Sequence, residues 1–333
     1  MKKVEAANAL GLIPSGADYA AVMNEQVLPA LNEISTVRKL KTSDGKELYT
    51  ETWPADHPKG TVLVLHGFTE NALKYSELIY SLLTNGFNVV SYDQRGHGRS
   101  WRDPEVTPLS VTHVDHFSEY ISDLRTVVEQ LLKPFPRPWF LFSHSMGGAV
   151  AALFLEQYPG IFDRAVLNAP MIAPNLSGLP RGVVNTICGS ARLRGHAKRY
   201  PFFMKPYSGP EDFATSHATD LNRFTWYDDI KAAREEFQNS VPSYAWVQEA
   251  AGVTRKILAS GQPEKISCPV LLFTAEHDAA VMPRPQEAFI SRVPQGQRVF
   301  VKAARHEIFR SVDDVFFPWW QQILDFYGEG CVK

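Results

Sequence analysis

The chain has 333 residues, 44% of them hydrophobic, which is enough for a buried sheet covered by helices together with an additional module. Its 34 Lys and Arg against 36 Asp and Glu give a formal charge of -2, so no overall field would recruit nucleic acid. Three widely separated cysteines argue against a disulfide framework or a zinc site, and we expect no metal and no cofactor.

The N-terminal segment lacks the apolar run and cleavage signal of a secretory peptide, and no apolar stretch of 18 residues occurs in the chain. We therefore expect a cytoplasmic protein without an obligate protein partner, and peripheral contact with the inner face of the membrane stays open. Residues 14–35 place four apolar side chains at helical spacing: Met23, Val27, Leu31 and Ile34. Because the polar face is acidic, we interpret residues 1–35 as a helical strap rather than a membrane anchor.

The pattern then changes to strands and helices in alternation. Residues 36–53 alternate around Asp44-Gly45, which predicts a hairpin of two antiparallel strands. Short apolar runs predict six buried strands, at 61–65, 88–92, 138–142, 164–168, 269–274 and 298–302. Helices are expected at about 73–85, 115–132, directly after Ser145, and at 244–258, 284–292 and 314–327. Together they predict a mostly parallel eight-stranded sheet with helices on both faces.

The alternation of strands and helices is interrupted between Met171 and about Ser243, where Pro, Gly and aromatic residues are frequent. We interpret residues 171–243 as a lid inserted between two parts of a core domain, 36–170 and 244–333. No internal repeat is evident.

Residues 143–148 read SHSMGG, at a point where an apolar strand turns abruptly into a helix. Such a turn exposes a serine hydroxyl as a nucleophile, and it needs small neighbours because backbone segments approach closely. Gly147 meets this need, whereas Ser143 stands where glycine is usual. Taken alone, the pattern is also that of an ordinary helix with Ser145 as its N-cap.

A serine hydroxyl becomes a nucleophile when a base accepts its proton and a further group orients that base. Asp278 and His306 each follow a predicted strand, and reactive groups gather at the carboxyl ends of strands in open α/β sheets. The order Ser145, Asp278, His306 is the one that α/β-hydrolases use, and we predict these three residues as the catalytic set. His277 and Glu276, beside Asp278, stay open as competitors.

Two backbone N–H groups are expected to stabilise the oxyanion of the reaction, those of Phe68 and Met146. Met146 follows the nucleophile, and Phe68 lies in the loop after the strand at 61–65. Gly67 allows that loop to approach the reacting carbonyl. We interpret His66 as a brace for the loop rather than a chemical participant.

At this point the chain resembles the monoacylglycerol lipase and lysophospholipase group of serine α/β-hydrolases over most of residues 36–327. The resemblance rests on His66-Gly67-Phe68, residues 93–100 (DQRGHGRS), residues 144–148 (HSMGG), residues 168–171 (NAPM), Asp278 and Arg305-His306. The segments 222–227 and 243–249 look more like bacterial lysophospholipase L2 enzymes, whereas His66-Gly67-Phe68 looks more like the glyceride lipases. The resemblance therefore leaves the headgroup open.

The resemblance implies a substrate with one acyl chain and a polar head. The insertion supplies apolar side chains that fit an acyl tunnel or, equally well, its own small core: Phe202, Phe203, Met204, Phe213, Phe224 and Trp226. Residues 181–205 hold six basic residues and no acid, with Arg192 and Arg194 as candidates to contact a phosphate head or an anionic membrane. The competing explanation is a solvated basic face paired with the acidic segment 206–243.

The leading hypothesis is a serine hydrolase that cleaves the carboxylic ester of a single-chain lipid, a lysophospholipid or a monoacylglycerol, through an acyl-enzyme intermediate. Two alternatives stay open. One is an amidase or peptidase of the proline iminopeptidase type on the same fold, and the other is a catalytically silent hydrolase fold that serves as a binding protein.

Overall fold

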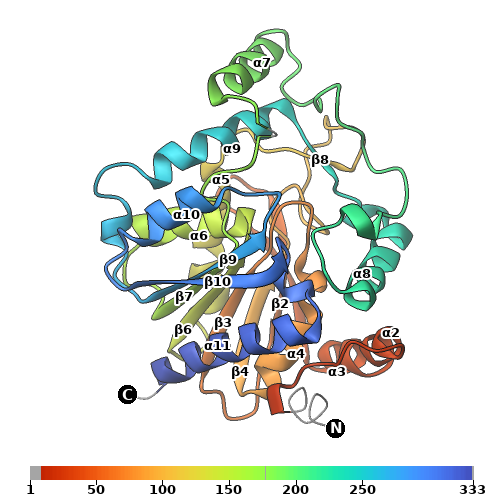
Figure 1. Ribbon diagram of the computed structural model, residues 1–333, viewed down its shortest axis with the longest axis vertical. Coiled ribbons are helices and arrows are strands. Elements are labelled where there is room, and N and C mark those ends of the chain that lie inside the picture. Colours follow the sequence, from red (N-terminus) through yellow and green to blue (C-terminus); the bar gives the residue numbers. More distant parts are fainter. Residues whose placement is uncertain (1–8, 177, 332–333) are drawn as a thin grey trace.

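A sheet of eight strands runs through the middle of the molecule in the computed structural model, which describes residues 9–176 and 178–331 (Figure 1). The strand order is β1-β2-β4-β3-β6-β7-β9-β10. The first two strands form an antiparallel hairpin, and β2 is antiparallel to β4, while all other neighbours are parallel. The strands are β1 (Thr36–Lys41), β2 (Glu47–Trp53), β3 (Gly60–Leu65), β4 (Phe87–Tyr92), β6 (Trp139–His144), β7 (Arg164–Asn168), β9 (Val270–His277) and β10 (Gly296–Arg305). The predicted mostly parallel eight-stranded sheet is confirmed.

Helices cover both faces of this sheet, as the sequence predicted. Side chains alternate along β3, so that Leu63 and Leu65 join the core on one face and Val62 and Val64 the core on the other. The first core is closed by α5 (Ser118–Val127), α6 (Met146–Gln157), α9 (Tyr244–Ile257) and α10 (Pro283–Ile290). The second is closed by α4 (Ser76–Thr84) and α11 (Asp313–Cys331).

The last two strands are longer than the sequence predicted. β9 extends to His277 and β10 to Arg305, so Asp278 and His306 follow their strands directly rather than four residues later. The hydropathy pattern missed these ends because β10 is an edge strand whose side chains are mostly exposed or half-buried.

The N-terminal segment packs on the second core through α2 (Tyr19–Val22), one π-helical stretch (Met23–Val27) and α3 (Leu28–Ile34). The buried positions Met23, Val27 and Leu31 were predicted correctly. Ile34 is 41% exposed, so that part of the prediction was wrong, because the helix ends there and the chain leaves for β1. Residues 1–8 of the predicted strap lie outside the described residues.

The insertion between β7 and α9 contributes no strand to the main sheet within the described residues. Its helix α7 (Arg181–Leu193) packs on α9, and its helix α8 (Leu221–Ala233) packs on α2 (Figure 1). A short strand, β8 (Val241–Pro242), pairs with β5 (Val111–Thr112) apart from the main sheet. That this insertion acts as a lid remains a prediction.

Arg223 ties α8 to three other parts of the chain. Its buried guanidinium donates to Ile13 O at 2.8 Å, to Glu77 Oε2 at 3.0 Å and to Asp313 Oδ1 at 2.8 Å. The N-terminal segment, α4, α8 and α11 therefore share one buried ionic contact. None of the helices in the described part of the chain has the length and apolar character needed to cross a bilayer.

Candidate active site

Ser145 lies at the turn between β6 and α6, with φ 51° and ψ -117°. Residues other than glycine rarely adopt this conformation, and it persists only where the surroundings impose it. The Ser145 N–H donates to Asn168 O at 3.1 Å, which ties the turn to the neighbouring strand β7. A Cβ on Gly147 would lie 2.5 Å from His66 O, so the predicted need for glycine at this position is borne out.

The other small residues of the turn, Gly148 and Ser143, are small for different structural reasons. A Cβ on Gly148 would lie 2.5 Å from the Cβ of Pro170, so a second glycine is required that the sequence reading did not single out. Ser143 is fully buried, and its hydroxyl donates to Val166 O at 3.2 Å. The serine in place of the usual glycine therefore has its polar group satisfied and leaves the turn intact.

The three side chains predicted as the catalytic set meet at the carboxyl edge of the sheet. His306 Nε2 lies 2.7 Å from Ser145 Oγ, and His306 Nδ1 lies 2.7 Å from Asp278 Oδ2. The other carboxylate oxygen of Asp278 accepts the N–H groups of Ala280 and Val281 at 2.9 and 3.0 Å. This geometry lets His306 take a proton from the serine while the carboxylate orients the ring.

The carboxyl of Asp278 is held in its charged form. Burial raises the pKa of Asp278, but the His306 charge, the hydrogen bond to its ring and the two backbone N–H groups lower it further, to below its usual value. The competitor His277 is exposed and lies 3.6 Å from Glu276. No contact in the described part of the chain joins either competitor to Ser145, so the geometry favours Asp278 and His306.

The loop after β3 brings Phe68 beside Ser145. A Cβ on Gly67 would lie 3.1 Å from Ser145 Cβ, which shows how closely the loop approaches. The Phe68 N–H has no acceptor within residues 9–176 and 178–331. Met146 is the first residue of α6, where backbone N–H groups have no partner one turn back. Both predicted oxyanion donors are thus placed near Ser145, and their role stays a prediction.

His66 holds the same loop. Its Nε2 accepts the N–H of Gln94 at 2.8 Å, so the proton is on Nδ1, which donates to Gly67 O at 2.7 Å. Burial lowers the pKa of His66 below its usual value, although the Asp93 charge opposes this, so the neutral ring is favoured. These contacts agree with its interpretation as a brace.

Comparison with known proteins identifies the family. The family described as "Serine aminopeptidase, S33" matches residues 56–313. The chain belongs to this family. Lysophospholipase L2 of Escherichia coli K12 is 30% identical over 297 residues, which cover 82% of each chain, and human monoglyceride lipase is 34% identical over 138 residues, which cover 41% of this chain and 43% of that enzyme. The resemblance to the monoacylglycerol lipase and lysophospholipase group is confirmed.

Solved structures support the α/β-hydrolase fold. A soluble variant of monoglyceride lipase from Saccharomyces cerevisiae matches with a TM-score of 0.68 at 19% identity, covering 89% of this chain and 97% of that one. Monoacylglycerol lipase from Paleococcus ferrophilus matches with a TM-score of 0.66 at 20% identity, covering 85% and 99%. At these identities the likeness concerns the fold alone.

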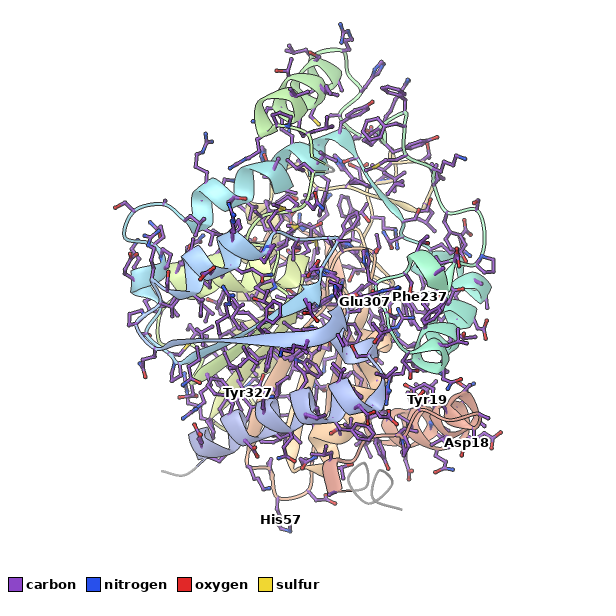
Figure 2. All side chains as sticks on the ribbon, in the orientation of Figure 1. Asp18, Tyr19, His57, Phe237, Glu307 and Tyr327 are labelled. Atoms are coloured by element: carbon purple, nitrogen blue, oxygen red, sulfur yellow. The ribbon has the colours of Figure 1, made fainter. Side chains whose placement is uncertain are left out.

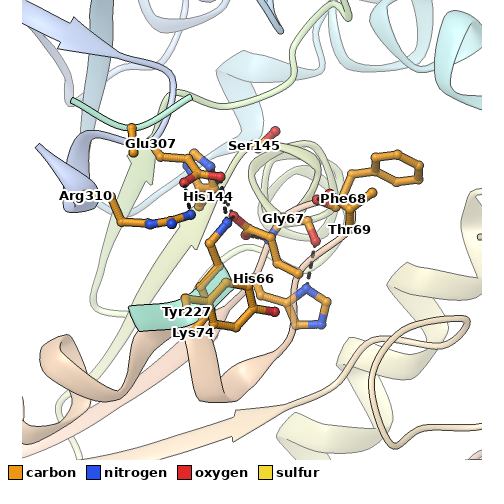
Figure 3. A network of polar contacts seen from close by, with 12 residues as sticks. His66, Gly67, Phe68, Thr69, Lys74, His144, Ser145, Tyr227, Glu307 and Arg310 are labelled. Atoms are coloured by element: carbon orange, nitrogen blue, oxygen red, sulfur yellow. Dashed lines mark hydrogen bonds and ion pairs between the residues drawn. The ribbon is translucent and has the colours of Figure 1, made fainter. Parts of the chain in front are cut away.

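A buried ionic network of this hydrolase lies beside the loop after β3, and the sequence reading missed it (Figure 3). Lys74 Nζ lies 2.9 Å from Glu70 Oε1 and 2.6 Å from Glu307 Oε1, and Arg310 Nη1 lies 2.7 Å from Glu307 Oε2. Glu70 also accepts the Gly67 N–H at 2.6 Å. Glu307, labelled in Figure 2, is buried and follows His306 directly, so the network joins the loop after β3 to the histidine predicted to be catalytic.

An apolar cavity of about 460 Å³ has Ser145 and Phe68 in its wall. Two of the residues predicted to bind substrate, Phe203 and Met204, also line it. Side chains from α7 and α9 complete the wall, among them Val184, Ile187, Cys188, Trp246 and Ala250. The apolar lining suits an acyl chain.

The other predicted substrate residues are not brought to this cavity. Trp226 packs against Tyr19 with ring centroids 6.4 Å apart, and its indole N–H donates to Asn24 Oδ1 at 3.0 Å. Its burial therefore comes from the N-terminal helices, which corrects the assignment to an acyl tunnel. Phe202 is 86% exposed, and neither Arg192 nor Arg194 lines the cavity. These three residues belong to the outer surface of the insertion.

Proposed function

We propose that the protein is a serine hydrolase that cleaves the carboxylic ester of a single-chain lipid through an acyl-enzyme intermediate. The observation that carries the proposal is the hydrogen-bonded chain Ser145–His306–Asp278 at the wall of an apolar cavity. Family membership and the relatives named lysophospholipase and monoglyceride lipase support the ester class.

In the proposed reaction, Ser145 Oγ attacks the carbonyl carbon of the ester while His306 Nε2 takes its proton. The N–H groups of Phe68 and Met146 stabilise the oxyanion, each by about 10²- to 10³-fold in rate by analogy with other hydrolases. His306 then gives its proton to the leaving alcohol oxygen. A water deprotonated by His306 hydrolyses the acyl-enzyme, and Ser145 regains its proton.

The lining of the apolar cavity favours a fatty acyl group over the amidase alternative. Apart from Lys205, the described residues of this lining are uncharged. The free amine of a peptide N-terminus would lose its water there without gaining a carboxylate partner, which is costly. An alkyl chain gains about 0.8 kcal/mol for each buried CH₂.

Ser145→Ala tests the nucleophile. We expect turnover of p-nitrophenyl butyrate and monooleoylglycerol to fall by about 10⁴-fold or more, with an unchanged circular dichroism spectrum. Ser143→Ala is the matched control, because that serine lies two residues away without contact to His306, and it should keep most of the activity. Retained turnover in Ser145→Ala would remove the assignment.

Two further measurements separate the alternatives. Wild-type protein should be labelled by a fluorophosphonate at Ser145, and absence of labelling together with absence of turnover would favour a silent binding protein. Cleavage of aminoacyl p-nitroanilides without ester hydrolysis would favour an amidase or peptidase.

We also propose that the outer surface of α7 and the segment after it touches an anionic membrane. Leu193 and Phe202 are 92% and 86% exposed, beside Arg192 and Arg194. The alternative, a basic face neutralised by the acidic segment 206–243, is weakened at Lys198, which pairs with Asp103 at 2.8 Å instead. Exposed apolar and basic side chains together are typical of peripheral membrane contact.

A further inference from the structure

A second cavity, of about 280 Å³, lies next to the reacting groups, and its lining is polar. Thr69 and Glu307 line it, and they follow Phe68 and His306 in the chain, whereas Phe68 lines the apolar cavity. The ring of His217, which also lines the polar cavity, is centred 5.4 Å from that of His306. Both cavities therefore lie next to the Ser145–His306 pair.

The inner wall of the polar cavity offers unused hydrogen-bond donors. Lys74 and Arg310 line it and are only 8% and 7% exposed. Lys74 Nζ donates to Glu70 and Glu307, which leaves one of its three N–H groups. Arg310 Nε is buried and has no acceptor within the described residues. Buried cationic donors without a full set of partners favour an anionic oxygen such as that of a phosphate.

The outer wall has the opposite character. Glu211 and Asp212 are exposed at its rim, and Asp228 is buried beside them, while the nearby cation Lys231 is already paired with Glu211. The whole lining holds four carboxylates against three cations. An ammonium group is favoured at this end, and a ligand with net negative charge is disfavoured.

We propose that the polar cavity binds the headgroup of a zwitterionic lysophospholipid, with the phosphate against Lys74 and Arg310 and the amine toward Glu211 and Asp212. This assignment rests on the proposed ester hydrolysis. The cations are buried beside Glu307, which follows His306, whereas Glu211 and Asp212 are exposed at the rim, and this arrangement matches the order glycerol, phosphate, amine in such a lipid. The acyl chain occupies the apolar cavity, whose wall includes Ser145.

The double variant Glu211→Gln/Asp212→Asn tests the amine end. Asn at 212 keeps the cap that Asp212 gives the Ala214 N–H, so the local turn is preserved. We expect kcat/KM for lysophosphatidylethanolamine to fall about tenfold, with kcat/KM for lysophosphatidylglycerol unchanged or raised. Monooleoylglycerol and p-nitrophenyl butyrate should be unaffected.

The matched control is Asp229→Asn/Glu235→Gln, which removes the same charge from exposed residues outside the cavity lining. It should leave all four substrates unchanged. On the inactive Ser145→Ala protein, calorimetry should detect glycerophosphoethanolamine binding that weakens about tenfold when Glu211→Gln/Asp212→Asn is added.

The outcomes separate this inference from the proposed function. If wild-type protein hydrolyses none of the esters, the proposed function fails and the inference with it. If wild-type protein hydrolyses monooleoylglycerol and p-nitrophenyl butyrate but the double variant treats all headgroups alike, the inference alone is overturned. Equal effects of the double variant and its control would also overturn it.

Discussion

The two cavities beside Ser145 would hold the proposed ligand by opposite physical means. The apolar cavity removes hydrocarbon from water, a contribution of about 25 cal/mol per Å² that depends little on exact geometry. The polar cavity is built from buried charges already bonded to one another, so a ligand must supply groups of matching charge and position. We expect such a hydrolase to be permissive toward acyl length and strict toward the headgroup.

The largest expected effect lies on the polar side, in Glu70→Gln. Burial raises the pKa of Glu70, but the Lys74 charge lowers it further, to about 2 from a usual 4.5. Since the folded state lowers this pKa, the stabilising effect is complete above about pH 4.5 and is lost as the pH falls toward 2. We expect the variant to lose about 3 kcal/mol in free energy of unfolding at pH 7, measured with urea, and progressively less below pH 4.5.

Glu129→Gln serves as its control, because Glu129 is an exposed residue whose ion-pair partner is the exposed Arg125. Its free energy of unfolding should match that of the wild-type protein at pH 7 and at pH 3. A loss in Glu70→Gln that is the same at pH 7 and pH 3 would show that the carboxylate charge is not what stabilises this wall.

The apolar side is tested by Ile187→Trp. Ile187 lines the cavity from α7, the helix farthest from the sheet (Figure 1), and is 39% exposed, so a larger ring fits without disrupting the core. The ring would occupy space needed by a long acyl chain. We expect kcat/KM for p-nitrophenyl palmitate to fall about tenfold, or ~1.4 kcal/mol, and that for p-nitrophenyl butyrate to stay unchanged.

Val183→Trp adds the same side chain one turn earlier on α7, at a residue 45% exposed that does not line the cavity. It should leave both esters unaffected. Equal losses for the long and the short ester in Ile187→Trp would mean that the acyl chain does not reach α7.

The smallest expected effect for each substituted residue concerns the outer surface of α7. Arg192→Gln/Arg194→Gln should weaken binding to vesicles containing phosphatidylglycerol by about 1 kcal/mol per residue at low salt, and by less at high salt. Sedimentation with vesicles measures it. Arg284→Gln/Lys302→Gln removes the same charge from exposed residues of α10 and β10. If both double variants weaken vesicle binding equally, binding depends on the total charge of the protein and not on the surface of α7.

The catalytic geometry could be predicted because strand ends define one edge of the sheet. Ser145, Asp278 and His306 each follow a parallel strand, and strands that run the same way end at the same edge. Their distances in the chain therefore did not hinder the prediction. Their roles remain proposals until the variants are measured.

The ionic network could not be predicted in the same way. Glu70 and Lys74 are four residues apart, and Glu307 and Arg310 three, spacings at which side chains become neighbours in a helical turn. The sequence reading named neither pair, although these spacings are a signal that could have indicated each one. The contact that joins the pairs, from Lys74 to Glu307, spans 233 residues. Only the packing of the segment before α4, which holds Glu70 and Lys74, against the segment after β10 brings the pairs together.

Trp226 shows a further limit of predicting a residue's surroundings from composition. Its aromatic side chain and its neighbours in the insertion indicated burial, and the residue is indeed only 4% exposed. Whether the burying surface is an acyl tunnel, a local core or another segment depends on where α8 docks. The N-terminal helices supply that surface, and Asn24, which accepts the Trp226 N–H, is 202 residues away in the chain.

The shared contact of Arg223 has a consequence for chimeric proteins. Because this side chain binds the backbone at Ile13 as well as Glu77 and Asp313, the second half of the insertion is built against the start and the end of the chain. Exchanging residues 171–243 with those of a relative would therefore place a foreign α8 against residues of the N-terminal segment, α4 and α11 that do not match it. A chimeric protein that keeps this contact has to take the segment around Ile13 from the same relative as the insertion.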